Sequence, residues 1–226
     1  MMLPQKIKNR LESIENLPTL PLVIDHLGRA LGDPEADIDQ VVGIIEDDPA
    51  IMARIMKVVN SSFYLGVRKV TSLKSAIVKL GFQTVNNIAM SAAVFSTFPP
   101  TSRHLFNRTE FWRHCIYTGI TAEILSACLD RPTDQGPSQD VLHLCGLLHD
   151  IGKIVFAQFF HDQFLAALKV SQEELIPLSA AETRVLGLDH AQAGAWLGQR
   201  WNLSEQLLEV IRWHHNPEKA TAEHRE

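Results

Sequence analysis

The C-terminal half of this chain is rich in histidine, the side chain best suited to bind a transition metal or to transfer a proton near neutral pH. The 226 residues include 10 histidines, and all but His26 lie after residue 103. Five histidines and one aspartate stand in patterns that suggest chemistry: His114, His149, Asp150, His190, His214 and His215. A set dominated by imidazole favours iron, manganese or zinc over magnesium. We therefore expect a divalent transition metal, as one ion or two.

His149 and Asp150 directly follow the apolar residues 141–148. A carboxylate buried at the end of such a helix needs a cation or several hydrogen-bond donors, because an unpaired buried charge is costly. A divalent metal would supply that cation. The alternative is an Asp150 that caps a following helix, with His149 exposed. The two residues alone do not decide between these interpretations.

His214 and His215 extend an apolar helix face. They lie seven and eight residues after Leu207, in the stripe that also contains Leu208 and Ile211, and such a stripe faces the core. The alternative is a pair of histidines favoured by the dipole at a helix C-terminus, with Asn216 and Pro217 ending the helix.

His190 and His114 are less distinctive. His190 opens a predicted helix, and His114 lies on the more polar side of another. Each alone is more often a hydrogen-bonded core histidine than a ligand. Together with the other four side chains, they form the set that a helical bundle would need for a metal cage.

The elements that must position these side chains are helices. Capping-box spacing occurs at Asp37/Gln40, Asn107/Glu110, Ser179/Glu182 and Asp189/Gln192, and Asp48-Pro49 is typical of a helix start. No run alternates apolar and polar residues as a strand would, so we predict an all-α chain. The pair Pro99-Pro100 suggests a seam, and we divide the chain into an N-terminal half, 1–103, and a C-terminal half, 104–226.

The net charge of −5 is unevenly distributed. Residues 49–109 contain eight Lys or Arg and no Asp or Glu. Such a segment could meet nucleic acid, but no aromatic residues are interleaved with its charges, so attraction to the acidic remainder or simple solvation is favoured. The uncharged residues 81–102 are too polar for a membrane span. Three cysteines and no apolar leader favour a reduced, cytoplasmic compartment.

Several motifs together resemble a known family. The run Leu147-Leu148-His149-Asp150-Ile151-Gly152-Lys153 resembles the HD superfamily of metal-dependent phosphohydrolases, and the order of the six ligands resembles its HD-GYP branch. Asp48-Pro49, the segment starting at Asn60-Ser61-Ser62 and the segment 76–82 resemble HDOD domains, as do residues 17–21 and 187–190. The match covers roughly residues 15–218.

The resemblance implies a multi-helix HD-like bundle with an N-terminal helical subdomain. It implies a bacterial signal-transduction module that binds a signalling protein or a nucleotide. The alternative is a phosphohydrolase acting on a nucleotide or cyclic dinucleotide, in which the six ligands hold metal and Asp150 and Lys153 serve catalysis. The chain departs from the enzymes because the GYP tripeptide is absent and Asn216 replaces the expected glutamate. The final HD aspartate would lie on a later helix, after Glu226, so either the sequence is a fragment or this ligand is missing.

Overall fold

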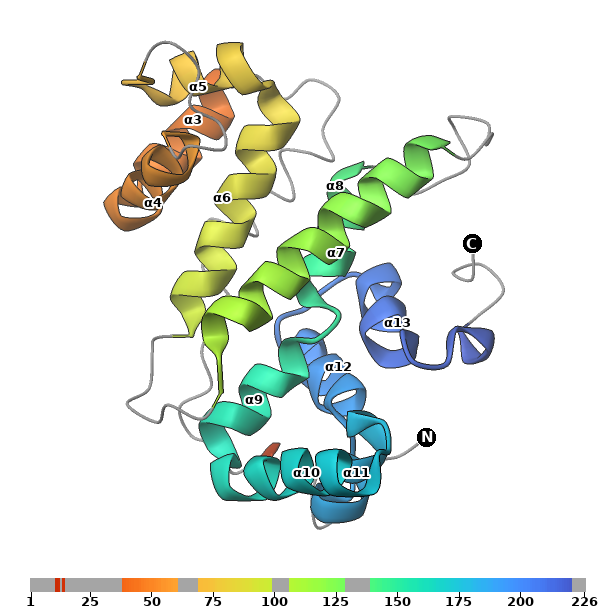
Figure 1. Cartoon of the computed structure of the whole chain (residues 1–226). Helices are drawn as coiled ribbons and strands as arrows, with labels where there is room; N and C mark the ends of the chain where they lie inside the picture. The colour runs from red at the N-terminus through yellow and green to blue at the C-terminus, as the bar shows by residue number, and fades with distance from the viewer. Residues whose placement is uncertain are drawn as a thin grey trace. The chain divides into compact units, whose positions relative to one another are not determined.

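The computed structural model describes residues 11–12, 14, 38–60, 69–98, 106–128 and 139–220, and every regular element within these ranges is helical (Figure 1). The all-α prediction is confirmed. The helices are α3 (Ile38–Glu46), α4 (Pro49–Val59), α5 (Leu73–Leu80), α6 (Phe82–Thr97), α7 (Arg108–Cys128), α8 (Gln139–Leu148), α9 (Ile151–Phe159), α10 (His161–Glu174), α11 (Leu178–Leu186), α12 (His190–Arg200) and α13 (Glu205–Trp213), followed by the short 3₁₀ helix η1 (Pro217–Lys219).

The chain forms two compact units. One comprises Pro18–Pro99, and the other combines Met1–Leu17 with Pro100–Glu226. The finer division of an HDOD domain into halves 1–103 and 104–226 stays a prediction.

In the unit Pro18–Pro99, helices α3 and α5 pack against their neighbours α4 and α6, and α4 packs on α6. The predicted start of α4 is confirmed, because the Asp48 carboxylate accepts hydrogen bonds from the backbone N–H groups of Ala50 and Ile51, at 3.0 and 3.1 Å. Ile51 and Ile55 then lie on one buried face. A cap and an apolar stripe are sufficient to specify this helix.

Asn60 closes the C-terminal end of α4 and ties it to the chain ten residues later. Its side-chain N–H₂ group donates to the carbonyl oxygens of Met56 and Val70, and its side-chain oxygen accepts from the Val70 N–H, each at 2.9 Å. One amide therefore satisfies three backbone groups that the helix end and the following segment would otherwise leave unpaired.

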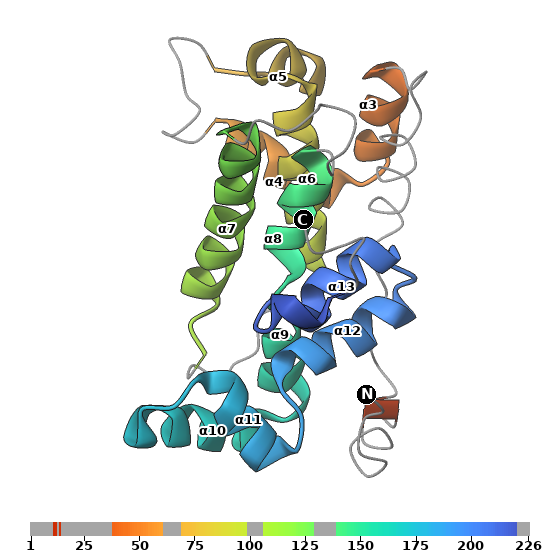
Figure 2. The same ribbon diagram turned by 90° about the vertical axis from the view of Figure 1, so that its right-hand side faces the viewer.

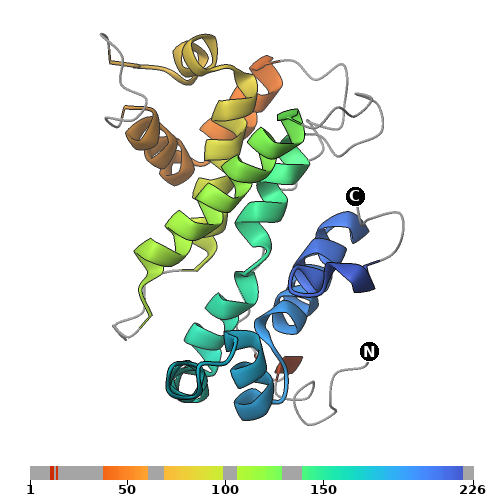
Figure 3. The same ribbon diagram turned by 45° about the vertical axis from the view of Figure 1, so that its right-hand side comes forward.

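In the second unit, α7 and α8 run antiparallel and in contact (Figure 3). Helices α9 and α12 pack together, α13 lies beside α12, and α10 and α11 form a hairpin (Figure 2). This arrangement brings the start of α7, the α8–α9 turn, the start of α12 and the end of α13 toward one region.

Two glycine contacts allow these helices to approach closely. A Cβ atom on Gly146 of α8 would lie 2.2 Å from the backbone nitrogen of Gly119 on α7, and a Cβ on Gly152 of α9 would lie 1.9 Å from the His190 carbonyl oxygen on α12. Neither position can hold a larger residue unless the backbones separate. These contacts therefore set the distances between the helices that carry the histidines.

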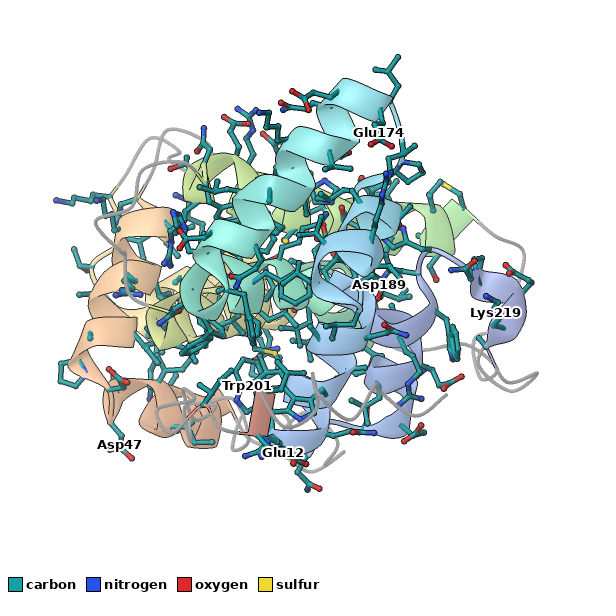
Figure 4. All side chains as sticks on the ribbon, turned by 90° about the horizontal axis from the view of Figure 1, so that it is seen from below. Glu12, Asp47, Glu174, Asp189, Trp201 and Lys219 are labelled. Carbon is teal, nitrogen blue, oxygen red and sulfur yellow. The ribbon has the colours of Figure 1, made fainter. Side chains whose placement is uncertain are left out.

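The capping predictions have mixed outcomes. The Asp189/Gln192 box is present at the start of α12 (Asp189 is labelled in Figure 4), and Asn107 caps the Glu110 N–H. The Ser179/Glu182 box is wrong, because α11 begins at Leu178 without a side-chain cap and Glu182 is buried against His190. The Asp37/Gln40 box involves Asp37, which is outside the described residues.

Among the described residues, one segment, Val141–Phe159, is long and apolar enough to span a membrane by length and composition. About two-thirds of it (67%) is buried inside the protein, and it includes the α8–α9 turn. This combination is typical of the core of a helical domain, so it is weak evidence for a membrane span.

Candidate metal centre

All six predicted ligands converge in the second unit. Their ligand atoms form two groups, His114 with His149 and Asp150, and His190 with His214 and His215, and within each group the atoms lie within 4.8 Å of one another. These residues come from α7, the α8–α9 turn, α12 and the end of α13. Residues spread over a hundred positions of sequence thus surround one region.

The Asp150 carboxylate lies between the two groups. Its Oδ2 is 3.3 Å from the Nε2 atoms of both His114 and His149, and its Oδ1 is 3.1 Å from His190 Nε2 and 3.6 Å from His214 Nε2. A carboxylate placed in this way can contribute one oxygen to each of two ions.

The spacing within each group suits a small transition-metal ion. The His114 and His149 Nε2 atoms are 3.2 Å apart and form a nearly equilateral triangle with Asp150 Oδ2. In the second group, His190 Nε2 is 3.3 Å from His214 Nε2 and 2.8 Å from His215 Nε2. Ligand atoms around a tetrahedral ion with bonds of about 2.0–2.1 Å lie ~3.3 Å apart.

The tautomers of three histidines follow from their second ring nitrogens. Nδ1 of His149 lies 2.7 Å from the Gly146 carbonyl oxygen, and Nδ1 of His214 lies 2.9 Å from that of Ile211. Nδ1 of His190 lies 2.5 Å from a Glu182 carboxylate oxygen. These oxygens only accept, so each Nδ1 carries a proton and donates it, and in the neutral ring each Nε2 presents a lone pair.

These lone pairs point at one another and at a carboxylate. Two bare Nε2 atoms, such as those of His190 and His214, cannot hydrogen-bond to each other, and Asp150 Oδ1 is buried without a hydrogen-bond partner among the described groups. Bringing acceptors together away from water is unfavourable unless a cation lies among them. The residues present therefore fit a metal, because a cation within each group would satisfy the atoms of that group.

The charges of the centre are strongly perturbed. Burial alone would raise the pKa of Asp150, but its interactions with His149, His190 and His214 outweigh burial and hold that pKa far below its usual range. Burial, aided by His214 and His190, lowers the pKa of His215 to about 4. Burial also lowers the pKa of His114. An ionised carboxylate and neutral imidazoles are the forms that ligate metals.

His190 differs from these rings. Burial acts to lower its pKa, but the carboxylates of Asp150 and Glu182 outweigh burial and raise it. The ring lies between two acidic groups, at 3.1 Å from Asp150 Oδ1 and 2.5 Å from Glu182 Oε2. His190 is therefore flanked by a carboxylate at each of its two ring nitrogens.

Lys153, the second predicted catalytic residue, follows Asp150 by one helical turn of α9. Its Nζ donates to Asp150 Oδ2 at 2.6 Å. The lysine therefore lies beside the first group, where its positive charge faces the same carboxylate oxygen as His114 and His149.

Helix ends place the ligands, in ways that correct two of our interpretations. Asp150 is at the N-cap position of α9 but makes no side-chain capping bond, and the His149 side chain is only 11% exposed. The capping alternative is therefore wrong. Helix α13 ends at Trp213, so His214 and His215 lie in the turn after it rather than continuing the helical stripe.

Each group combines buried ligands with one exposed histidine, His114 in the first group and His215 in the second. The side chain of His190 is 1% exposed, whereas that of His114 is 56% exposed. A molecule from solution can therefore reach the first group beside His114 and the second beside His215, while the His190 ring itself is enclosed by protein.

Sequence reasoning missed Glu182. It lies eight residues before His190, and its carboxylate accepts hydrogen bonds from both the backbone N–H and the ring of that histidine, at 2.8 and 2.5 Å. Its position three residues after Ser179 suggested helix capping instead. An acidic residue in the helix just before a ligand histidine was the available signal.

Comparison with known proteins assigns the family, because residues 17–217 match the HDOD domain. The chain belongs to the HDOD family. An HDOD domain protein of unknown function from Geobacter sulfurreducens superposes with a TM-score of 0.81 at 26% identity, and the match covers 96% of this chain and 70% of that one. A protein from Marinobacter aquaeolei, provisionally named a signal transduction protein, has a TM-score of 0.80 at 28% identity over 99% and 48% of the two chains.

A protein from Shewanella amazonensis, provisionally named a metal-dependent phosphohydrolase, superposes with a TM-score of 0.62 at 25% identity over 96% of this chain and 75% of that one. An uncharacterised protein of Treponema pallidum is 28% identical over 214 residues, which are 95% of this chain and 40% of the relative. This HDOD chain thus spans well under half of that longer relative. The resemblance to HDOD domains drawn from the sequence is confirmed.

Proposed function

We propose that this HDOD chain is a bacterial signal-transduction module whose HD centre holds one or two divalent transition-metal ions of iron, manganese or zinc. The observation that carries the proposal is the cluster of Nε2 atoms beside Asp150 Oδ1, in which His190 Nε2 lies 3.3 Å from His214 Nε2 and 2.8 Å from His215 Nε2. The provisional name of the Marinobacter relative supports a signalling role. We place the module in the cytoplasm, with a signalling protein or a nucleotide as its partner and without a membrane or nucleic-acid role.

The two groups would each hold an ion. His114, His149 and Asp150 Oδ2 would form one site, and the other histidines with Asp150 Oδ1 would form the second. The first offers three protein ligands, and its open side leaves room for a ligand from solution. The second offers four ligands, of which His190 is enclosed and His215 is exposed. A divalent ion supplies Lewis-acid polarisation of a phosphoryl group and makes water easier to ionise at neutral pH.

Metal analysis tests this proposal directly. Protein purified without chelator should contain at least one equivalent of transition metal by elemental analysis, and Asp150→Ala should lose it because both groups share this carboxylate. His161→Ala, a substitution of a histidine outside both groups, should retain the metal. A wild-type content below about a tenth of an equivalent, even after addition of Fe²⁺, Mn²⁺ or Zn²⁺, would exclude a metal centre.

A second candidate function is hydrolysis of a phosphodiester in a nucleotide or cyclic dinucleotide. It is favoured by the exposed ligand His114 and by Lys153, whose ammonium group lies beside the same carboxylate oxygen. Lys153 would neutralise phosphate charge as a point cation, and Asp150 would hold its partners in place. Asn216 in place of the expected glutamate argues for the signalling role instead.

Turnover separates the two functions. The metal-loaded protein is incubated with cyclic dinucleotides and with bis(4-nitrophenyl) phosphate, and products are measured. Hydrolysis that disappears in Asp150→Ala and falls strongly in Lys153→Met would establish the enzyme. Binding of a cyclic dinucleotide without products would instead support the signalling module.

A further inference from the structure

We propose that Glu182 is a positioning residue that orients the His190 ring and thereby sets the metal affinity of the group His190, His214 and His215. This inference rests on the proposed metal-binding function and adds a residue that belongs to neither ligand group. Glu182 reaches the metal only through His190, so it is not itself a ligand in this proposal.

Glu182 contacts both the backbone and the ring of His190. Glu182 Oε2 accepts two hydrogen bonds from one residue, at 2.8 Å from the His190 backbone nitrogen and at 2.5 Å from its Nδ1. Both side chains are almost fully enclosed, with 0% of Glu182 and 1% of His190 exposed. The first bond holds the start of α12 and the second holds the ring, so together they fix where Nε2 points.

The position of His190 in its helix explains why a side chain, rather than a backbone carbonyl, must accept the hydrogen bond from its Nδ1. His149 and His214 each donate from Nδ1 to the carbonyl oxygen three residues earlier, of Gly146 and Ile211, which the end of a helix offers without further provision. His190 is the first residue of α12, and the residue three before it, Gly187, lies outside any helix. No preceding turn is available, and Glu182 from α11 supplies the acceptor instead.

The free-energy cost of burying Glu182 also supports a positioning role. Its second oxygen, Oε1, is buried without a hydrogen-bond partner in the described part of the chain. A buried carboxylate with one unpaired oxygen destabilises a fold relative to an apolar residue of similar size. Carboxylates that accept from the free nitrogen of a metal-bound histidine raise its basicity and fix its tautomer, which compensates for such a cost.

The experiment measures Zn²⁺ affinity of the whole chain by competition with a chromophoric chelator, resolving the two equivalents. Glu182→Gln keeps an acceptor oxygen but loses the charge, and Glu182→Leu loses both. We expect one equivalent to weaken roughly tenfold in the first variant and up to ~100-fold in the second, with the other equivalent changed much less. Glu123→Gln is the matched control, since Glu123 makes a similar 2.6 Å contact with His143 away from the centre.

The outcomes separate this inference from the function on which it rests. Wild-type protein that binds no Zn²⁺ contradicts the metal centre itself. Wild-type binding that Glu182→Gln leaves within twofold contradicts only the positioning role, as does equal weakening of both equivalents or equal weakening by Glu123→Gln. If Glu182→Leu does not fold, Glu182→Gln decides alone. Nitrogen-15 NMR of His190 adds an independent readout, because Nδ1 should be protonated in wild type and lose that preference in Glu182→Leu.

Discussion

Asn60 and Asp150 are both polar side chains at helix ends, and both stand in motifs by which this chain resembles its family, yet their surroundings differ. The Asn60 amide is matched by backbone groups of Met56 and Val70 at 2.9 Å. Around Asp150, ring nitrogens that are acceptors face a carboxylate that is also an acceptor. A polar motif whose atoms are all paired builds the fold, whereas one that gathers acceptors without donors is typical of a site for a cation.

The largest effect should come from removing metal. Chelation should lower the free energy of unfolding of the second unit by about 4 kcal/mol when wild type had been saturated at roughly a thousand times its Kd. Thermal unfolding with and without EDTA measures this, and Asp150→Ala should not respond to EDTA. An EDTA effect of the same size in Asp150→Ala would mean that the stabilising metal binds elsewhere.

A glycine-to-alanine substitution should change the free energy of unfolding in opposite directions in the two units. Gly152→Ala forces a Cβ into the His190 carbonyl oxygen, so α9 and α12 must separate, and we expect a loss of ~3 kcal/mol together with weaker metal binding. Gly43→Ala in α3 has no atom within 4 Å of the new Cβ and should stabilise by about 0.5–1 kcal/mol, because alanine favours helix. Urea denaturation compares the two. Similar losses for both would refute the close-packing account of the centre.

Asn60→Ala should destabilise the fold without changing metal binding. It removes three hydrogen bonds and leaves backbone groups of Val70 unpaired, which we expect to cost about 2 kcal/mol. Metal content by elemental analysis should stay at the wild-type value. Loss of metal in a folded Asn60→Ala protein would contradict the assignment of Asn60 to fold rather than function.

The smallest effect should be seen in cysteine labelling, which reports on the histidine-bearing unit. Cys128 is exposed, whereas Cys115 and Cys145 are buried. Burial raises the pKa of Cys145 to about 12 and also raises the pKa of Cys115, so at about pH 8 neither forms appreciable thiolate. Mass spectrometry after iodoacetamide should find one modified cysteine in wild type and Asn60→Ala, and more in Gly152→Ala. Three rapid modifications in wild type would show that the unit opens readily.

Local features were the most predictable from sequence. The starts of α4 and α12 depend on Asp48 and Asp189, which act on N–H groups two or three residues away, and both were predicted correctly. The Glu182 spacing was equally regular but served another purpose, because its carboxylate reaches His190 from a different helix. Spacing within one helix cannot show whether a carboxylate will accept hydrogen bonds from the start of its own helix or from a residue of another helix.

The ligand set shows the same division. Residue types suggested a set of candidate ligands, since imidazole and carboxylate groups in apolar surroundings need a hydrogen-bond partner or a cation. The set is His114, His149, Asp150, His190, His214 and His215. Their chemistry, however, depends on which nitrogen bears the proton and which rings face solvent. The carbonyl acceptors of His149 and His214 lie three residues before each ring, but the contact of Glu182 with His190 and the exposure of His114 depend on how separate helices pack.

The sequence by itself determined that this chain is helical, that it resembles HDOD domains and that its C-terminal half contains a histidine-rich set of candidate ligands, because helix periodicity, caps and side-chain chemistry are encoded within a few residues. Only the tertiary structure decided that Asp150 lies between two groups of histidines, that the centre is open beside His114 and that Glu182 holds His190. The reason is physical: contacts between helices depend on close approaches such as that of Gly152 to His190, and these exist only once the helices have packed.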